Sequence, residues 1–182
     1  MRPRRKRPSR PALQPAKRRT ILEAVRILAT DVDRVLTDAG MYYAESGEEL
    51  KKFNTRDGMG IKLLQKAGLV TAIVTQEQTK LVARRAEKLA IPEVHQGAFN
   101  KLAVLRDMVR RHGVTLDQVA YIGDDVNDLE ALQAVGFSAA PADGHPSVRR
   151  VVRYICRHKG GEGAVREVAD LILAAKTGEG TV

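Results

Sequence analysis

The sequence predicts an α/β fold, a Rossmann-like parallel sheet with helices on both faces. From about residue 26 onward, short apolar runs alternate with longer segments of helical period. Such alternation favours parallel strands joined by helical crossovers. Acidic, hydroxyl and basic residues recur where the apolar runs end. Because ligands of doubly wound sheets bind beyond the carboxyl ends of the strands, we expect a binding site at that edge.

The alternation also predicts the individual elements. Six apolar runs are expected to be strands, at residues 27–30, 70–75, 94–96, 119–123, 137–140 and 152–156. Five segments between or after them are expected to be helices, at residues 60–67, 78–90, 101–112, 127–134 and 162–176. Gly68, Gly113 and Gly136 each follow a helical segment, where glycine adopts a positive φ at little cost.

One segment interrupts this pattern. Residues 40–43 and 49–53, joined around Ser46 and Gly47, predict a β-hairpin directly after the first strand. No insertion is large enough to form a cap domain. The expected site therefore has no built-in lid.

The length and composition indicate a single domain. A chain of 182 residues is long enough for one well-buried domain and too short for two ordinary ones. We expect a basic, disordered leader at residues 1–20, the domain at residues 21–177 and a flexible tail at residues 178–182. No apolar stretch is long enough to span a bilayer, and the start lacks the apolar segment of a secretory signal. The single cysteine, Cys156, fits a reducing cytoplasm and is expected to be a small buried hydrophobe.

The net charge of +9 is concentrated in the leader. Residues 1–19 hold nine of the 31 basic residues and no acid, and the rest of the chain holds 22 basic and 22 acidic residues. Such a leader can attract RNA, anionic lipid or a partner protein electrostatically. No aromatic platform or base-reading motif accompanies the charge, so we expect no specific nucleic-acid role.

Candidate catalytic residues stand at the ends of four apolar runs or just beyond them. They are Asp31 and Asp33 after the first run, Thr75 at the end of the second, Lys101 at the start of a helix, and Asp124, Asp125 and Asp128 after the fourth. Carboxylates hold magnesium through oxygen, and a hydroxyl or an ammonium group binds phosphate. One carboxylate can attack phosphorus to form an aspartyl phosphate, and a second can protonate the leaving alkoxide and then activate water.

Each of these residues also has a simpler explanation. The acids at 124, 125 and 128 can stabilise the start of the following helix without any metal. Lys101 can be a solvated lysine at a helix start, and Thr75 a β-branched strand residue. Their joint occurrence, in this order and at these strand ends, favours the functional interpretation.

In combination, these residues resemble the four short motifs of the haloacid dehalogenase superfamily of phosphotransferases. The motifs match Asp31 with Asp33, Thr75, Lys101, and Asp124 with Asp128. A narrower resemblance, to the small capless branch acting on octulosonate 8-phosphate and nonulosonate 9-phosphates, is carried by residues 48–54, 56–58, 96–97 and 160–167. The resemblance runs from about residue 26 to about residue 175.

The resemblance implies a role for each motif residue. Asp31 would be the nucleophile and a magnesium ligand, and Asp33 the general acid/base and a ligand through its main-chain carbonyl. Asp124 would complete the protein ligands of Mg²⁺, and Asp125 and Asp128 would support it. Thr75 and Lys101 would hold the phosphate. The resemblance also implies a homotetramer in which the hairpin packs against neighbours and adjacent subunits cover the site.

The expected substrate depends on the segment after Thr75. Relatives acting on nonulosonate 9-phosphates resemble this chain at Glu77, Arg85 and Lys88, whereas octulosonate enzymes usually carry a basic residue at position 77. If a helix begins by Glu77, these three residues fall within an arc of roughly 80°. The sequence therefore favours nonulosonate 9-phosphate over octulosonate 8-phosphate. The alternative is that the three residues form a solvated helix face.

Three positions depart from the family pattern, which has glycine where this chain has Arg34, Ala39 and Gln76. Glycine near a phosphate usually indicates a positive φ or a close backbone approach. A positive φ at Arg34 would cost roughly 1–3 kcal/mol. These departures motivate an alternative function, a catalytically weak or silent member that binds a sugar phosphate or a partner enzyme.

Overall fold

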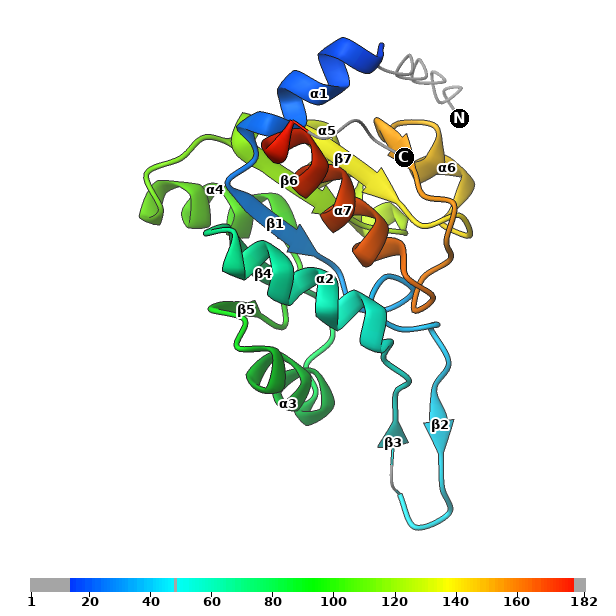
Figure 1. Cartoon of the computed structure of the whole chain (residues 1–182). Helices are drawn as coiled ribbons and strands as arrows, with labels where there is room; N and C mark the ends of the chain where they lie inside the picture. Colours follow the sequence, from blue (N-terminus) through cyan, green and yellow to red (C-terminus); the bar gives the residue numbers. More distant parts are fainter. Residues whose placement is uncertain (1–13, 48, 179–182) are drawn as a thin grey trace, which may run out of the picture.

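A six-stranded parallel sheet forms the centre of the molecule (Figure 1). The computed structural model describes residues 14–47 and 49–178 of the chain. In spatial order the strands are β5 (Glu93–His95), β4 (Val70–Val74), β1 (Ile27–Thr30), β6 (Val119–Ile122), β7 (Phe137–Ala140) and β8 (Tyr154–Ile155). Every neighbouring pair in this sheet is parallel. The predicted fold class is confirmed, with β1 in the middle of the sheet.

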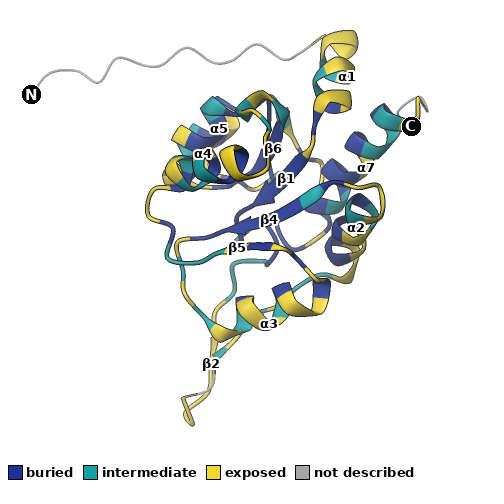
Figure 2. Ribbon diagram, turned by 90° about the vertical axis from the view of Figure 1, so that its left-hand side faces the viewer, coloured by how far each residue is buried: buried dark blue, intermediate teal, exposed yellow. Residues whose placement is uncertain are grey.

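Helices cover both faces of the sheet (Figure 2). They are α1 (Pro15–Ala24), α2 (Thr55–Lys66), α3 (Lys80–Leu89), α4 (Lys101–Arg111), α5 (Leu129–Ala134), α6 (Pro146–Arg149) and α7 (Ala164–Thr177), with short 3-10 helices η1 (Leu116–Gln118) and η2 (Val126–Asp128). Among the described residues, no helix combines the length and apolarity that crossing a bilayer requires.

The alternation of side chains along the strands produces two hydrophobic cores. Leu28 of β1 packs in the core beneath α2, α3 and α7, whereas Ile27 and Ala29 face the core beneath α4 and α5. The strands are therefore buried on both faces, as a parallel sheet requires. Cys156 is buried in the first of these cores, as expected.

Two helices begin at residues that the apolar periodicity does not identify. Helix α2 begins five residues before the expected position, because the Asn54 side chain accepts a hydrogen bond from the amide of Arg56. Helix α3 begins at Lys80, after the expected position, because Thr79 accepts a hydrogen bond from the amide of Leu81. Capping side chains, rather than apolar residues, fix both starting points.

The three glycines that follow helices meet different structural requirements. Gly68 and Gly113 have φ values of 80° and 64°, which confirms the prediction for both. Gly136 does not have a positive φ, so the prediction is wrong there. A Cβ atom at that residue would lie 1.9 Å from the carbonyl oxygen of Asp117. Gly136 is therefore required for a close backbone approach.

The start of the described chain differs from the expected disordered leader. Residues 15–20 belong to α1, which packs against α7 and continues to Ala24. Leu22 is 3% exposed, and the Lys176 ammonium donates a hydrogen bond to the carbonyl oxygen of Glu23 at 2.8 Å. The packing of a few apolar side chains outweighs the high charge of this segment. Residues 1–13 of the expected leader lie outside the described residues, as does the expected tail beyond Gly178.

The predicted hairpin is confirmed, and it projects from the body of the molecule (Figure 1). Its antiparallel strands are β2 (Tyr42–Tyr43) and β3 (Glu49–Leu50), and a bridge between Thr37 and Phe53 extends its base. Four apolar side chains on it are exposed, those of Met41, Tyr42, Tyr43 and Leu50. The described chain contains no cap domain.

Candidate active site

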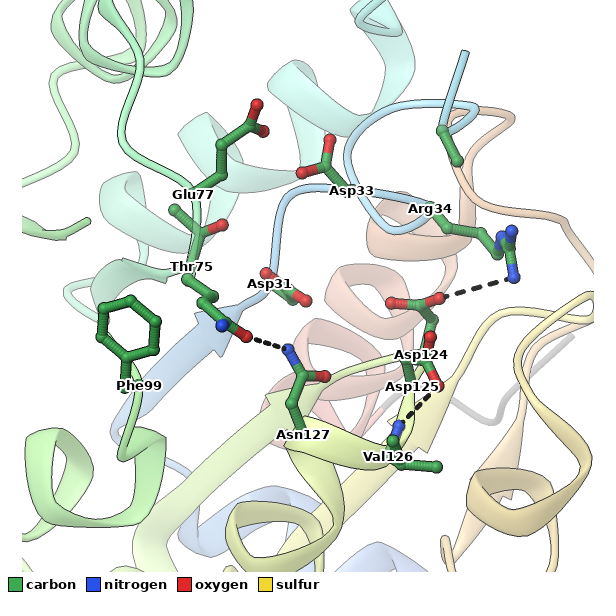
Figure 3. Close-up of a pocket in the computed structure, with 12 residues that line it drawn as sticks. Asp31, Asp33, Arg34, Thr75, Glu77, Phe99, Asp124, Asp125, Val126 and Asn127 are labelled. Atoms are coloured by element: carbon green, nitrogen blue, oxygen red, sulfur yellow. Dashed lines mark hydrogen bonds and ion pairs between the residues drawn. The ribbon is translucent and has the colours of Figure 1, made fainter. Parts of the chain in front are cut away.

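The carboxyl ends of β1, β4 and β6 open into a cavity of about 600 Å³ (Figure 3). Thr30, the last residue of β1, is in register with Ile73 of β4 and Ile122 of β6, so the three strands end within one residue of one another. The predicted site residues that line the cavity are Asp31, Asp33, Thr75, Glu77, Asp124 and Asp125. Phe99, 79% exposed, and Val126 form an apolar part of its rim. The sheet thus brings together residues that lie almost a hundred positions apart.

Three buried aspartates form the most acidic part of the site. Carboxylate oxygens of Asp31, Asp124 and Asp128 all lie within 4.8 Å of one another. Burial and the charge of Asp128 raise the pKa of Asp31 to about 6. Burial and the charges of Asp31 and Asp128 raise the pKa of Asp124 to about 7. A divalent cation would relieve this repulsion, and carboxylate oxygens are suitable ligands for magnesium.

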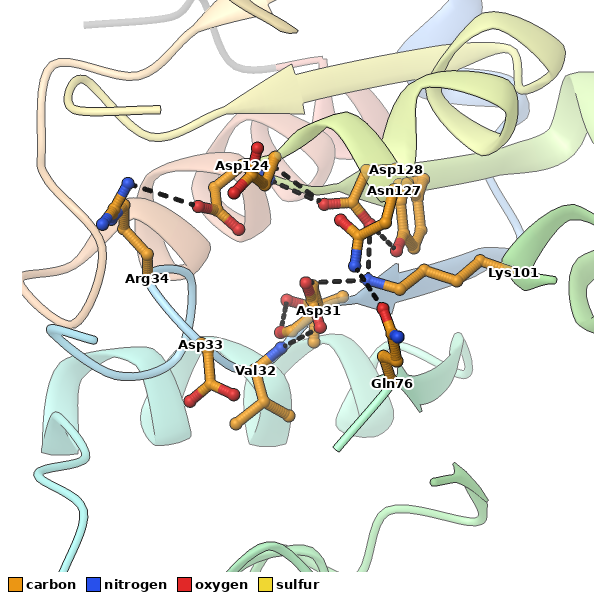
Figure 4. A network of polar contacts seen from close by, with 12 residues as sticks. Asp31, Val32, Asp33, Arg34, Gln76, Lys101, Asp124, Asn127 and Asp128 are labelled. Carbon is orange, nitrogen blue, oxygen red and sulfur yellow. Dashed lines mark hydrogen bonds and ion pairs between the residues drawn. The ribbon is translucent and has the colours of Figure 1, made fainter. Parts of the chain in front are cut away.

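Asp128 is fully engaged by protein donors (Figure 4). Its Oδ1 accepts hydrogen bonds from Lys101 at 2.6 Å and from the Tyr121 hydroxyl at 2.7 Å. Its Oδ2 accepts from the amides of Asp124 at 3.0 Å and Asp125 at 3.2 Å. Asp128 therefore shapes the loop after β6, which leaves Asp31 and Asp124 as the side chains best suited to hold a metal.

Lys101 lies behind Asp31 rather than in the main cavity. It is the first residue of α4, 2% exposed, and its Nζ lies 2.8 Å from Asp31 Oδ2. Although burial opposes its charged form, the carboxylates of Asp31 and Asp128 raise the pKa of Lys101 above its usual value. A permanent cation is therefore in contact with the first aspartate of the loop.

Asp33 is held by a residue that the sequence does not single out. The Lys51 ammonium lies 2.7 Å from Asp33 Oδ1 and also contacts Glu77 Oε2. The Lys51 side chain has no exposed surface. The only signal for Lys51 in the sequence is its place within residues 48–54, the segment that carries the narrower family resemblance.

The expected face of Glu77, Arg85 and Lys88 is not formed, and the arc argument is wrong because Glu77 precedes α3. Glu77 lines the cavity. Arg85 instead donates a hydrogen bond to the carbonyl oxygen of Asn54 at 2.9 Å, and its guanidinium lies 5.5 Å from the centre of the Phe53 ring. Lys88 is exposed on α3 and does not line the cavity.

Thr75 and Gln76, the first two residues after β4, have different surroundings. Thr75 is 1% exposed, and it lines the cavity. It is therefore available to a ligand. Gln76 accepts a hydrogen bond from the side chain of Asn127 at 3.2 Å, and its φ is not positive. The glycine usual at position 76 is therefore not needed for backbone conformation in this chain.

The other two departures from glycine do have a positive φ, one of the two explanations considered for glycine at these positions. The φ values are 54° at Arg34 and 63° at Ala39. Arg34 lines the cavity, and its Nη1 lies 3.9 Å from Asp124 Oδ2. Burial and the neighbouring aspartates raise the pKa of Asp124, and the positive charge of Arg34 offsets part of that rise. Arg34 thus places a second cation beside the aspartates.

A family model described as haloacid dehalogenase-like hydrolase matches residues 64–168, more than half of the chain. The chain belongs to the haloacid dehalogenase-like hydrolase family. Within this family, the chain is 43% identical over 154 residues to the 3-deoxy-D-manno-octulosonate 8-phosphate phosphatase KdsC of Escherichia coli, a match that covers 85% of this chain and 82% of that protein. KdsC of Yersinia pestis is 44% identical over 152 residues, with 84% and 81% covered.

Solved structures of the same family are also similar to this chain. The 3-deoxy-D-manno-octulosonate 8-phosphate phosphatase of Moraxella catarrhalis, in complex with magnesium, phosphate and KDO, has a TM-score of 0.88 and 36% identity, with 90% of this chain and 94% of that chain covered. The cobalt-bound phosphatase of Haemophilus influenzae has a TM-score of 0.83 and 39% identity, with 86% and 92% covered. The chain is therefore a member of the branch that the sequence resemblance indicates.

Proposed function

We propose that this protein is a magnesium-dependent phosphomonoesterase that acts on a 2-keto-3-deoxy sugar acid phosphate. One observation carries the proposal: carboxylate oxygens of Asp31 and Asp124 lie within 4.8 Å of each other in the cavity, which Asp33 also lines, and Lys101 is bound to Asp31. The magnesium and KDO in the Moraxella catarrhalis structure, and the names of the relatives, support the choice of metal and substrate class.

The proposed reaction has two steps. The Asp31 carboxylate attacks phosphorus while the bond from phosphorus to the leaving oxygen breaks, and Asp33 gives that oxygen a proton. Asp33 then takes a proton from a water molecule that attacks the aspartyl phosphate, which releases inorganic phosphate and restores Asp31. Lys101 and the Thr75 hydroxyl hold the phosphoryl oxygens.

Asp31, Asp124 and the main-chain carbonyl of Asp33 are the proposed magnesium ligands, with Asp125 and Asp128 in support. Bound magnesium supplies positive charge that offsets the repulsion between a carboxylate and a phosphoryl group. The raised pKa values of Asp31 and Asp124 support this assignment, because both carboxylates are poorly compensated without a cation.

Octulosonate 8-phosphate is the first candidate substrate, because relatives more than 40% identical are named for it. Nonulosonate 9-phosphate is the second candidate. The position of Glu77 on the cavity rim supports it, since a carboxylate there can accept hydrogen bonds from sugar hydroxyls. Arg85 and Lys88 do not line the cavity of the single chain, so they no longer support the nine-carbon substrate.

The hairpin supports the further proposal of a homotetramer. Tyr43 is 72% exposed and Leu50 is 62% exposed on an arm that projects from the body (Figure 1). Exposed apolar side chains gathered on one arm are typical of an interface.

A reducing cytoplasm is the proposed location of the protein. The buried, unpaired thiol of Cys156 agrees with this proposal.

A phosphate-release assay tests the proposal. Wild type, Asp31→Asn and Arg34→Gly are assayed with both sugar acid phosphates, with magnesium and with a chelator. We expect wild-type turnover that needs magnesium and falls by at least about 10³-fold in Asp31→Asn. Light scattering on the same samples gives the oligomeric state. An inactive wild type, together with an active Arg34→Gly variant, would instead support the silent-member alternative.

A further inference from the structure

Lys51 is a buried lysine whose ammonium group joins two carboxylates at the edge of the cavity. Its side chain is 0% exposed, and its Nζ contacts both Asp33 and Glu77. Burying an ammonium group is unfavourable unless acceptors compensate for its lost hydration. The two carboxylates provide that compensation, so Lys51 and its partners form one unit.

The unit joins three separate segments of the chain. Asp33 lies in the loop after β1, Glu77 lies in the loop after β4, and Lys51 directly follows β3 of the hairpin. The next residue, Lys52, points elsewhere and binds Asp38 at 3.0 Å with its side chain 61% exposed. Successive side chains of an extended segment point to opposite sides, so the hairpin directs one lysine into the site and the other to solvent.

The contacts on Asp33 are one-sided. Lys51 Nζ lies 2.7 Å from Oδ1, and the Thr37 hydroxyl lies 3.5 Å from the same oxygen. Among the described residues, no hydrogen bond engages Oδ2 of Asp33. Figure 3 shows the Asp33 and Glu77 carboxylates on the same side of the cavity, near Asp31. The oxygen without a partner is therefore the one available to a bound ester.

Without Lys51, little would fix this orientation. The Asp33 side chain is 38% exposed, and an aspartate at such a site has several rotamers open to it. The Thr37 contact, at 3.5 Å, is at the limit of a hydrogen bond. Lys51 is the close, charged contact that selects one rotamer.

We propose that Lys51 is a positioning residue that holds Asp33 in the orientation needed for proton transfer. The inference rests on the proposed function, in which Asp33 gives its proton to the leaving oxygen as the bond from phosphorus to that oxygen breaks. Because Lys51 belongs to the hairpin, the position of the hairpin sets how well Asp33 performs this step.

The kinetic test compares two esters that differ in their need for a proton. The alkoxide released from 3-deoxy-D-manno-octulosonate 8-phosphate needs protonation, whereas para-nitrophenolate leaves without it. Hydrolysis of the aspartyl phosphate is common to both esters, so the first step is measured by itself, as release of the sugar acid or of para-nitrophenolate in a single turnover. In Lys51→Met we expect the rate of this step to fall about 10²-fold for the sugar ester, the size of a general acid contribution, and less than about fivefold for para-nitrophenyl phosphate. KM should stay within about threefold for both esters, because Lys51 does not line the cavity.

Two further variants separate positioning from folding. Lys51→Arg keeps the charge, so its rate on the sugar ester should be at least about tenfold higher than that of Lys51→Met. Lys52→Met removes the neighbouring, exposed lysine and should leave both rates unchanged. Equal losses on both esters, or a loss confined to KM, would overturn the proposal.

A crystal structure of Lys51→Met beside one of the wild type supplies a measure that does not depend on the substrate. We expect the Asp33 carboxylate of the variant to turn away from Asp31 or to occupy several rotamers. An unchanged Asp33 orientation would overturn the proposal even if both esters were hydrolysed. If the wild type hydrolyses neither ester, the proposed function fails, and this structural comparison alone still decides the role of Lys51.

Discussion

The backbone of Gly160 packs so closely against Arg34 that a Cβ atom at residue 160 would lie 1.9 Å from the Arg34 carbonyl oxygen. Gly161, with a φ of 66°, continues the contact, since its Cβ would lie 2.5 Å from the amide nitrogen of Asp38. The Asn54 side chain donates a hydrogen bond to the Gly161 carbonyl at 2.9 Å. The loop before α7 therefore shapes the loop that carries Asp31 and Asp33.

Replacing Gly160 should therefore damage the site as well as the fold. In Gly160→Ala, the backbone around Arg34 must move, and overpacking of this kind costs about 1–3 kcal/mol. We expect that loss in urea unfolding, together with a fall of at least about tenfold in magnesium-dependent kcat/KM. Gly113→Ala is the control, because it has a φ of 64° but nothing within 4 Å, so it should lose stability and keep its kcat. Wild-type turnover in Gly160→Ala would show that the two loops are not coupled.

Arg34 places a positive charge where a magnesium ion would have to approach Asp124. Its Nη1 lies 3.9 Å from Asp124 Oδ2, and 42% of its side chain is exposed. Repulsion between cations a few ångströms apart costs about 1 kcal/mol at a solvated site. We expect Arg34→Gly to lower the dissociation constant for magnesium about fivefold in calorimetric titrations. Arg34→Lys, which keeps the charge, should stay near the wild-type value, and an equal or weaker affinity in Arg34→Gly would contradict this explanation.

The sequence predicts the general position of the site well, for a physical reason. Residues that follow parallel strands must meet at one sheet edge, so the placement of Asp31, Thr75 and Asp124 follows from the strand pattern alone. The possibility of a positive φ at Arg34 comes instead from the family resemblance, because the family has glycine at that position. The position of the site depends on local pattern and topology, which the sequence contains directly.

Contacts between distant segments are harder to predict. Lys51 meets Asp33 and Glu77 because the chain returns to the site where the hairpin ends, and no periodicity in the sequence marks that contact. The interpretation of Arg85 fails because helix α3 begins at a capping threonine, which removes Glu77 from the helix and changes which residues share a face. A shift of a few residues in a helix start is enough to overturn an argument based on helical angles.

The buried aspartates predict how pH affects the metal-free protein. The pKa of Asp31 is about 6 and that of Asp124 about 7, both above the value of 3.8 for an unperturbed aspartate. Between about pH 4 and pH 7 the folded state therefore binds more protons than the unfolded state, so the free energy of unfolding falls as pH rises through this range. The two carboxylates are coupled, so they are treated as one unit. Together they should lower the free energy of unfolding by about 2–4 kcal/mol above pH 7 and leave it unchanged below pH 4.

Magnesium should reverse this loss, because it replaces the protons on the two carboxylates. We expect the rise in Tm produced by a fixed magnesium concentration to be small at pH 5 and to grow up to about pH 8. Differential scanning calorimetry across this pH range measures the effect, and Asp124→Asn should remove most of it. A rise in Tm that is independent of pH would show that protons and magnesium do not compete at this site.

Helix α1 should contribute to stability without contributing to catalysis. Leu22 is 3% exposed where α1 packs on α7. Helix α1 lies at the end of the sheet where β1 begins (Figure 1), whereas the cavity is at the carboxyl ends of the strands. Truncating a buried leucine to alanine costs about 2–4 kcal/mol, so Leu22→Ala should lose that amount in urea unfolding. Because α1 contacts none of the proposed catalytic residues, kcat should stay at the wild-type value at temperatures where the variant is folded. Lys17→Ala changes an exposed residue of the same helix and should alter stability by less than about 0.5 kcal/mol. An equal effect of the two substitutions would show that α1 is not part of the folded core.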